Sequence, residues 1–326
     1  MKQFLILLLV VFSTRTLAQA QEYLPQNIIQ LDDKFSHHIA LVEKSSHTLY
    51  LYQNNNGTPQ LLKQYKVATG KFTGNKASEG DHKTPEGIYL LERFLSAQEL
   101  VGMYGEEKSK MYGAGAFTTN YPNVIDERLG KGGSGIWLHS TDDNTRINKG
   151  LDSRGCVVVV DEDLKDISKY IDLANTSMVI VQNINFQQKK TWESVKNNIM
   201  GVVANWQESW KNKNFDSYIG HYHPEKFHDS KGNFHAYKHY KKAVFSNPGT
   251  PVINFNHVSV LVQNDYAVVQ MEQDYRSTNI NDIGKKILYL QQDQNYNWKI
   301  VAEQWRKLDG ESRNLAFVPA MRFFKN

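Results

Sequence analysis

Apolar and polar positions divide the chain into two parts with different periodicities. Between about residues 38 and 182, short apolar or alternating segments are separated by turn signals such as Asn54-Asn55-Asn56-Gly57, which is typical of strands joined by loops. The predicted strands lie at 39–42, 48–52, 61–69, 87–91, 135–138, 156–160 and 177–181. One helix is predicted at 163–174, where Leu164, Ile167, Ile171 and Ala174 share a face. The first part is therefore expected to be a mainly β domain, either a sandwich or a barrel-like core.

The second part of the chain begins with helical spacing. A helix is predicted over 191–211 from an apolar stripe made of Trp192, Val195, Ile199, Val202, Val203, Trp206 and Trp210. Shorter helices are predicted at 215–222 and 237–245, followed by strands at 252–262, 266–275, 285–292 and 297–306. Helices followed by antiparallel strands predict an α+β domain. Its large aromatic side chains are expected to pack in the interior or to line it, with packing favoured; they are Trp206, Trp210, Tyr275 and Trp305.

Residues 1–20 have the pattern of a secretory signal peptide. Lys2 precedes an apolar run from Phe4 to Phe12, and Ala18-Gln19-Ala20 supplies a small-x-small cleavage site. The run is about half as long as the roughly 20 residues that a membrane span needs, so we expect cleavage after Ala20 and a periplasmic protein. The expected organisation is signal peptide 1–20, N-terminal arm 21–36, first domain 37–183, linker 184–192, second domain 193–308 and C-terminal tail 309–326. No other segment approaches the length of a transmembrane helix.

The net charge of +4 at pH 7 comes from dispersed basic residues. No basic stripe with interleaved aromatic residues indicates nucleic-acid binding, so no nucleic-acid partner is expected. The weak positive charge is compatible with anionic polymers of the cell envelope, and equally with ordinary solvated lysines.

Histidines and acids form two groups that invite a metal interpretation. His221, His223 and His235 lie near Asp229, but their spacing matches no strong zinc motif and the chain has no second cysteine. The run Asp161-Glu162-Asp163 is interpreted as the start of a helix capped by Asp161, with calcium as the weaker alternative. We therefore expect no metal site and no cofactor.

Cys156 is the only cysteine of the chain, so it has no intramolecular disulfide partner. It follows Ser153-Arg154-Gly155, and His139 lies at the end of the preceding predicted strand. A thiol attacks carbonyls as the thiolate, so it needs a base, which His139 can supply. Gly155 permits close packing, and the N–H groups of Gly155 and Cys156 are candidates for stabilising an oxyanion. The alternative is that Cys156 is an inert buried side chain opening a valine-rich strand.

Together the two motifs resemble the catalytic domain of the L,D-transpeptidase (YkuD) family of peptidoglycan enzymes. The family pattern is a strand-ending histidine followed by Ser-His-Gly-Cys, matched here by His139-Ser140 and by Ser153, Gly155 and Cys156. Thr69-Gly70 and Lys83-Thr84-Pro85-Glu86-Gly87 also match, so the resemblance spans about residues 37–183. Arg154 replaces a histidine and Val158 replaces the usual arginine. These departures indicate a divergent branch of the family. The segments 121–126 and 130–139 resemble the subgroup that includes L,D-carboxypeptidases and an amidase acting on lipoprotein-linked peptidoglycan.

The resemblance implies a role for each matching residue. Cys156 would be the nucleophile and His139 the general base and later the acid, while the Ser140 backbone carbonyl, in place of a common glycine, would orient the imidazole. Gly155 would supply an oxyanion N–H, and Arg154 and Ser153 would contact the substrate. The implied substrate is a peptidoglycan stem tetrapeptide, which loses D-alanine as a thioester forms. Water then gives a tripeptide, and an amine gives a cross-link.

The second domain resembles the NTF2-like fold over residues 193–308. Trp206-x-x-x-Trp210, Lys213-Asn214-Phe215-Asp216 and Glu303-Gln304-Trp305 are among the matching motifs. The resemblance implies a cone with a pocket, which is a candidate for binding a wall component or a partner protein.

The combination of the two domains resembles the cell-shape L,D-carboxypeptidases of helical and curved bacteria. The main expectation is therefore a cysteine-dependent L,D-carboxypeptidase. Its alternatives are an L,D-transpeptidase that forms 3-3 cross-links, an enzyme acting on lipoprotein-linked peptidoglycan, and a non-catalytic wall-binding scaffold.

Residues 93–120, which are glycine-rich around Gly113-Ala114-Gly115, fit either a lid over the cleft or a rigid excursion.

Overall fold

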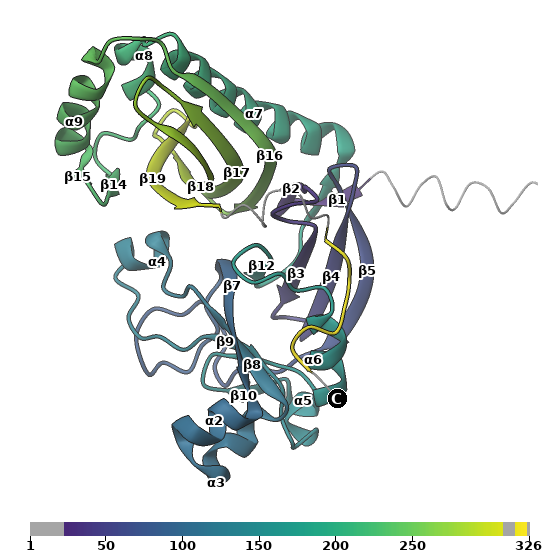
Figure 1. The fold of residues 1–326 in the computed structure, drawn as a ribbon. Helices are drawn as coiled ribbons and strands as arrows, with labels where there is room; N and C mark the ends of the chain where they lie inside the picture. Colours follow the sequence, from purple (N-terminus) through teal and green to yellow (C-terminus); the bar gives the residue numbers. More distant parts are fainter. Residues whose placement is uncertain (1–22, 309–316, 325–326) are drawn as a thin grey trace, which may run out of the picture.

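The computed structural model describes residues 23–308 and 317–324, which form two domains with different architectures (Figure 1). The predicted signal peptide and its cleavage site after Ala20 lie outside the described residues. So does part of the predicted tail, residues 309–316 and 325–326.

The first domain is built on one mixed eight-stranded sheet in the order β11-β9-β8-β7-β12-β3-β4-β5. Its strands are β3 (His38–Glu43), β4 (Thr48–Asn55), β5 (Thr58–Lys66), β7 (Gly87–Ser96), β8 (Gly115–Thr119), β9 (Trp137–His139), β11 (Val157–Val158) and β12 (Ser177–Val181). The pairs β12–β3 and β11–β9 are parallel and the others are antiparallel. A short parallel pair, β6 (Thr69–Gly70) with β10 (Leu151–Ser153), lies beside the sheet. The predicted mainly β fold of this domain is confirmed, although the strand expected at 156–160 is much shorter.

Residues 93–120 form an ordered excursion from this sheet. β7 continues to Ser96 and is followed by α2 (Ala97–Tyr104), α3 (Glu106–Ser109) and a 3-10 turn, η1 (Lys110–Tyr112), before β8 returns to pair with β7. Ser96 begins α2 with a capping box, because its hydroxyl accepts from the Glu99 N–H while the Glu99 carboxylate accepts from the Ser96 N–H. The segment therefore has its own secondary structure and fixed ends.

The helix predicted at 163–174 is α6 (Asp161–Ser168), which begins earlier and ends sooner than expected. Its N-cap is Val160, without a side-chain cap, so the prediction that Asp161 caps the helix is wrong. Beyond Ser168 the chain leaves the helix in turns that place Ala174 at a φ of 60°. Leu164, Ile167 and Ile171 are buried as predicted, whereas Ala174, which was predicted to share their face, lies beyond the helix and is only partly buried. The remaining helices of this domain are α4 (Val124–Arg128) and α5 (Thr145–Lys149).

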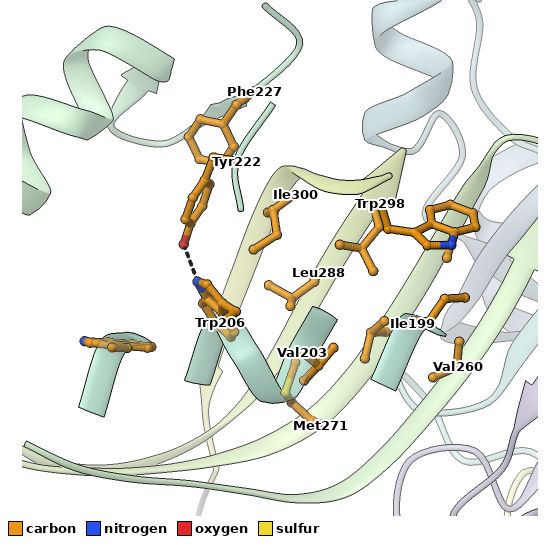
Figure 2. Packing of buried hydrophobic residues seen from close by; sticks show 14 of the residues in the cluster. Ile199, Val203, Trp206, Tyr222, Phe227, Val260, Met271, Leu288, Trp298 and Ile300 are labelled. Carbon is orange, nitrogen blue, oxygen red and sulfur yellow. Dashed lines mark hydrogen bonds between the residues drawn. The ribbon is translucent and has the colours of Figure 1, made fainter. Parts of the chain in front are cut away.

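In the second domain an antiparallel sheet curves against a long helix. The sheet contains β16 (Val252–Gln263), β17 (Tyr266–Arg276), β18 (Asn281–Gln292) and β19 (Trp298–Lys307). The helix is α7 (Lys189–Lys211), and α8 (Phe215–Ile219) and α9 (Phe234–Ser246) follow it, with a small hairpin of β14 (His228–Asp229) and β15 (Gly232–Asn233) between them. Figure 2 shows α7 side chains such as Val203 and Trp206 packed against Leu288 and Ile300 of the sheet. Each helix and strand predicted for this domain is observed, with shifted ends.

The aromatic side chains of the second domain do not all behave as expected. Trp206 and Trp210 are buried in the core, and Tyr275 packs against Trp210 with ring centroids 5.6 Å apart. Trp305 instead is 41% exposed, so the prediction that it belongs to the interior is wrong. Its indole lies across the backbone of Gly284, where an added Cβ would come within 2.5 Å of the ring.

The predicted arm and linker both belong to folded structure. β1 (Tyr23–Pro25) pairs with β13 (Phe186–Gln188), and β2 (Ile28–Gln30) pairs with β16 as the fifth strand of the second domain's sheet. The stretch 184–192 therefore contains a strand and the start of α7 instead of a free linker. Its polar composition misled the prediction, because β13 and the first turn of α7 are largely exposed and need few apolar side chains.

The two domains share one buried interface. Ile39, Ile88 and Val179 of the first domain belong to the same apolar cluster as Leu261 and Val268 of the second. Polar bonds cross it as well: the Tyr266 hydroxyl accepts from the Ile88 N–H at 2.8 Å, Gln270 Nε2 donates to Ser177 Oγ at 3.2 Å, and Lys285 Nζ donates to the Ala174 carbonyl at 2.6 Å. The eight-stranded sheet of the first domain and the curved sheet of the second are thus joined by a continuous core.

Removal of the Tyr266 hydroxyl tests this interface. In Tyr266→Phe the buried Ile88 N–H loses its acceptor, so we expect the free energy of unfolding to fall by about 1–3 kcal/mol. Urea denaturation followed by tryptophan fluorescence measures the change. Tyr296→Phe is the matched control because Tyr296 is 78% exposed. Equal unfolding free energies for the two variants would contradict the assignment.

Candidate active site

The edge of the eight-stranded sheet brings the two predicted catalytic residues to one face. β9 ends at His139, and the parallel strand β11 places Val157 opposite Leu138 and Val158 opposite His139. Cys156, one position before β11, is therefore level with Trp137. Because alternate residues of a strand share a face, Trp137 and His139 point to the same side. The Cys156 side chain thus projects from the same face as the imidazole, two positions along the neighbouring strand.

His139 is held as a neutral imidazole with a defined orientation. Its Nδ1 lies 2.6 Å from the Ser140 carbonyl oxygen, which can only accept, so we assign the proton to Nδ1. Nε2 is then the unprotonated nitrogen, free to accept a proton. Burial lowers the pKa of His139 to about 4, and the bond to Ser140 only partly opposes this shift. The ring is therefore neutral at pH 7.

Cys156 rests as a neutral thiol. The residue is partly buried, and its Sγ donates to the Gly135 carbonyl at 3.2 Å. Burial raises the pKa of the thiol to about 11, although the Trp137 N–H and the positive charge of Arg146 act in the opposite direction. Neither member of the pair is charged at neutral pH, so a reaction of this thiol needs proton transfer to a base in the same step.

The turn before Cys156 is closed by Ser153. Ser153 Oγ donates to the Cys156 carbonyl at 2.7 Å and accepts from the Gly155 N–H at 3.0 Å. The Gly155 N–H, which was predicted to serve an oxyanion, is thus bonded within the turn in this structure. Gly155 is nevertheless required by the backbone: its φ is 128°, and an added Cβ would lie 2.8 Å from the Lys83 carbonyl oxygen.

A cation that acts on both members of the pair is one that the sequence motifs did not single out. Arg146 lies in α5, its Nε bonds Asp152 Oδ2 at 2.5 Å, and its charge bears on the pKa of both His139 and Cys156. Arg154, which was expected to contact the substrate, is an exposed side chain in the turn before Cys156. In the sequence, Arg146 lies between the two motifs in a stretch without a recognisable pattern, so spacing could not reveal it.

An aromatic wall adjoins the imidazole. The Tyr112 ring contacts the His139 ring edge to face, with centroids 4.9 Å apart, and lies 5.4 Å from the Trp137 ring. Tyr104 stacks on Tyr112 at 5.3 Å. Tyr104 and Tyr112 come from the excursion between β7 and β8, which the sequence left open as a lid or a rigid segment.

The histidines considered as zinc ligands are used in local structure. His221 Nδ1 bonds the Ser217 carbonyl at 2.8 Å, and His223 Nδ1 accepts from the Glu225 and Lys226 N–H groups. Within residues 23–308 and 317–324, no group of three or more His, Cys, Asp or Glu side chains is placed to hold a metal ion. Over the same residues, no helix is long and apolar enough to cross a membrane.

Comparisons with known proteins place these features in a family. The family model of the Cds6 C-terminal NTF2-like domain matches residues 198–304. The structure of Bd1075 from Bdellovibrio bacteriovorus is similar with a TM-score of 0.75 and 31% identity, over 89% of this chain and 100% of that chain. The chain belongs to the family of Bd1075.

A second solved structure supports this assignment. The helical cell shape determining protein Pgp2 from Campylobacter jejuni is similar with a TM-score of 0.66 and 25% identity, over 85% of this chain and 95% of that chain. A comparison with curated protein sequences gives no match. The family assignment confirms the subgroup expected from the sequence, in which an L,D-transpeptidase-type β-sandwich catalytic domain is followed by an NTF2-like cone.

The raised pKa of Cys156 predicts slow alkylation. With a thiol pKa of about 11, little thiolate is present at pH 7, and the rate of reaction with iodoacetamide should rise about tenfold per pH unit up to pH 10. Intact-mass spectrometry measures it without interference, since the chain has no other thiol. The protein unfolded in urea is the control and should react faster at pH 7. A rate independent of pH between 6 and 9 would contradict a neutral resting thiol.

Proposed function

We propose that the protein is a periplasmic L,D-carboxypeptidase that trims peptidoglycan stem tetrapeptides to tripeptides and so alters cell shape. The observation that carries the proposal is the placement of Cys156 and His139 on one face of the sheet edge, with His139 Nδ1 bonded to the Ser140 carbonyl. The family relationship supports the biological role, because Pgp2 is described as a helical cell shape determining protein. The expected export signal supports the periplasmic location.

The chemistry begins with proton transfer from Cys156 Sγ to His139 Nε2 as the sulfur attacks the carbonyl carbon of the third stem residue. The tetrahedral intermediate collapses to a thioester, and His139 gives its proton to the amine of the departing D-alanine. A water molecule, deprotonated by His139, then attacks the thioester and releases the tripeptide and the thiol. Since Ser153 occupies the Gly155 N–H, we assign stabilisation of the oxyanion to the Cys156 N–H.

The second candidate function is a non-catalytic wall-binding protein. One observation favours it: burial lowers the pKa of His139 and raises the pKa of Cys156, so both side chains are neutral, as expected for an inert imidazole and thiol. In that case the function would lie in the NTF2-like domain, which would bind a wall component or a partner protein. The bond that fixes the His139 tautomer favours the enzyme, because an inert imidazole needs no free Nε2 acceptor.

A product assay separates these functions. We expect purified protein to convert tetrapeptide muropeptides to tripeptides with free D-alanine, and Cys156→Ser to lose at least about a thousandfold in rate. Chromatography of the products with mass spectrometry provides the measurement, and circular dichroism of the variant is the folding control. Dimers joined between two diaminopimelate residues would instead identify a transpeptidase. Unchanged muropeptides, with wall binding retained by Cys156→Ser, would identify a scaffold.

The pH dependence of kcat/KM follows from His139. Because burial lowers its pKa to about 4, the imidazole is neutral and able to accept a proton above that pH and loses this capacity below it. We expect kcat/KM to be nearly constant from about pH 5 to 9 and to fall as the pH drops through 4. Initial rates between pH 3.5 and 9 measure the profile. A bell centred near pH 7 would indicate a thiolate–imidazolium pair instead.

A further inference from the structure

Ser140, whose backbone carbonyl accepts from His139, is itself held by the excursion between β7 and β8. It is fully buried, and its N–H donates to the Gly115 carbonyl at 3.2 Å. Its hydroxyl accepts from the Ala114 N–H at 2.8 Å and donates to the Tyr112 carbonyl at 3.3 Å. Ser140, whose carbonyl orients the imidazole, is therefore bonded to three residues of the excursion: Tyr112, Ala114 and Gly115.

The carboxylate of Asp161 also binds the turn that holds Ser140. Asp161 Oδ1 accepts from the Ala114 N–H at 2.9 Å, so this N–H is shared between Asp161 and the Ser140 hydroxyl. Asp161 begins α6, shortly after Cys156 and β11 in the chain. The arrangement thus connects the strand that carries the thiol, through the excursion, to the strand that carries the histidine.

Gly113 allows these groups to meet. Its φ is 51°, and an added Cβ would lie 2.3 Å from Asp161 Oδ1 and 2.7 Å from Ser140 Oγ. A side chain at this position would therefore push the carboxylate and the hydroxyl apart. The same turn carries Tyr112, whose ring packs on His139.

We propose that the Ser140 hydroxyl and the Asp161 carboxylate are positioning groups for His139, acting through the Tyr112–Ala114 turn. They hold the Ser140 carbonyl against Nδ1 and the Tyr112 ring against the imidazole, so that Nε2 remains the acceptor. This role goes beyond that of the Ser140 backbone, and a glycine at position 140 would lack the hydroxyl. The effect on turnover rests on the proposed function, whereas the effect on the imidazole does not.

The test compares substitutions in the first turn of α6 in the full-length protein. Asp161→Ala removes the acceptor, Asp161→Asn keeps an oxygen there, and Glu162→Ala is the matched control because it removes a neighbouring exposed acid from the same turn. Ser140→Ala removes the hydroxyl and keeps the carbonyl. The first readout is the Nδ1–H resonance of His139 in histidine-labelled protein, assigned with His139→Gln. The second is kcat and KM on tetrapeptide muropeptides.

We expect Asp161→Ala and Ser140→Ala to lose the slowly exchanging Nδ1–H resonance and to lower kcat roughly 10- to 100-fold with little change in KM, since a displaced base slows proton transfer. Asp161→Asn and Glu162→Ala should retain the Nδ1–H resonance and the kcat of the unmodified protein. The proposal is overturned if Asp161→Ala and Ser140→Ala match Glu162→Ala, or if Asp161→Asn behaves like Asp161→Ala. If the unmodified protein does not turn over tetrapeptides, the proposed function fails, while the resonance still decides whether the turn positions His139.

Discussion

The structure depends on covering both faces of the eight-stranded sheet with apolar side chains. In β3, Ala40 and Val42 face the first domain's own core, whereas Ile39 and Leu41 face the cluster shared with the cone. β12 alternates in the same way. A strand buried on both faces reads as a continuous apolar run, which is the pattern of both segments in the sequence. The second domain is therefore a structural partner of the sheet whose edge carries Cys156 and His139.

This arrangement explains which parts of the fold the sequence could predict. Strands such as 177–181 and the helix at α7 were predictable because local periodicity and burial agree there. The pairing of β2 with β16 was not, since it joins segments more than 200 residues apart and leaves no local signal. The strand β13, in the polar stretch before α7, was not predicted because its exposed residues have the composition of a loop.

The residues of the candidate site likewise fall into those with a local sequence signal and those without one. Cys156, His139 and the Ser140 carbonyl could be proposed as a group because they lie in two short motifs, each continuous in sequence, and the strand register brings these motifs together. Arg146, Tyr112 and Asp161 could not, because each reaches the site from another element. Gly155 shows the limit of motif reasoning, since its N–H is taken by the side chain of Ser153. Which backbone groups remain free is settled by neighbours, and residue type alone does not reveal it.

The insertion of β2 into the cone's sheet also orders the events of folding. Asn27 and Val262 are hydrogen-bonded to each other across most of the chain, so β2 can pair only when the distant β16 is also available. Such distant contacts are slow to close, and the apolar face of β3 and β12 stays open to water until they form. Until the second domain forms, this apolar face is a surface at which the unfolded chain can aggregate, so completion of the first domain depends on completion of the second.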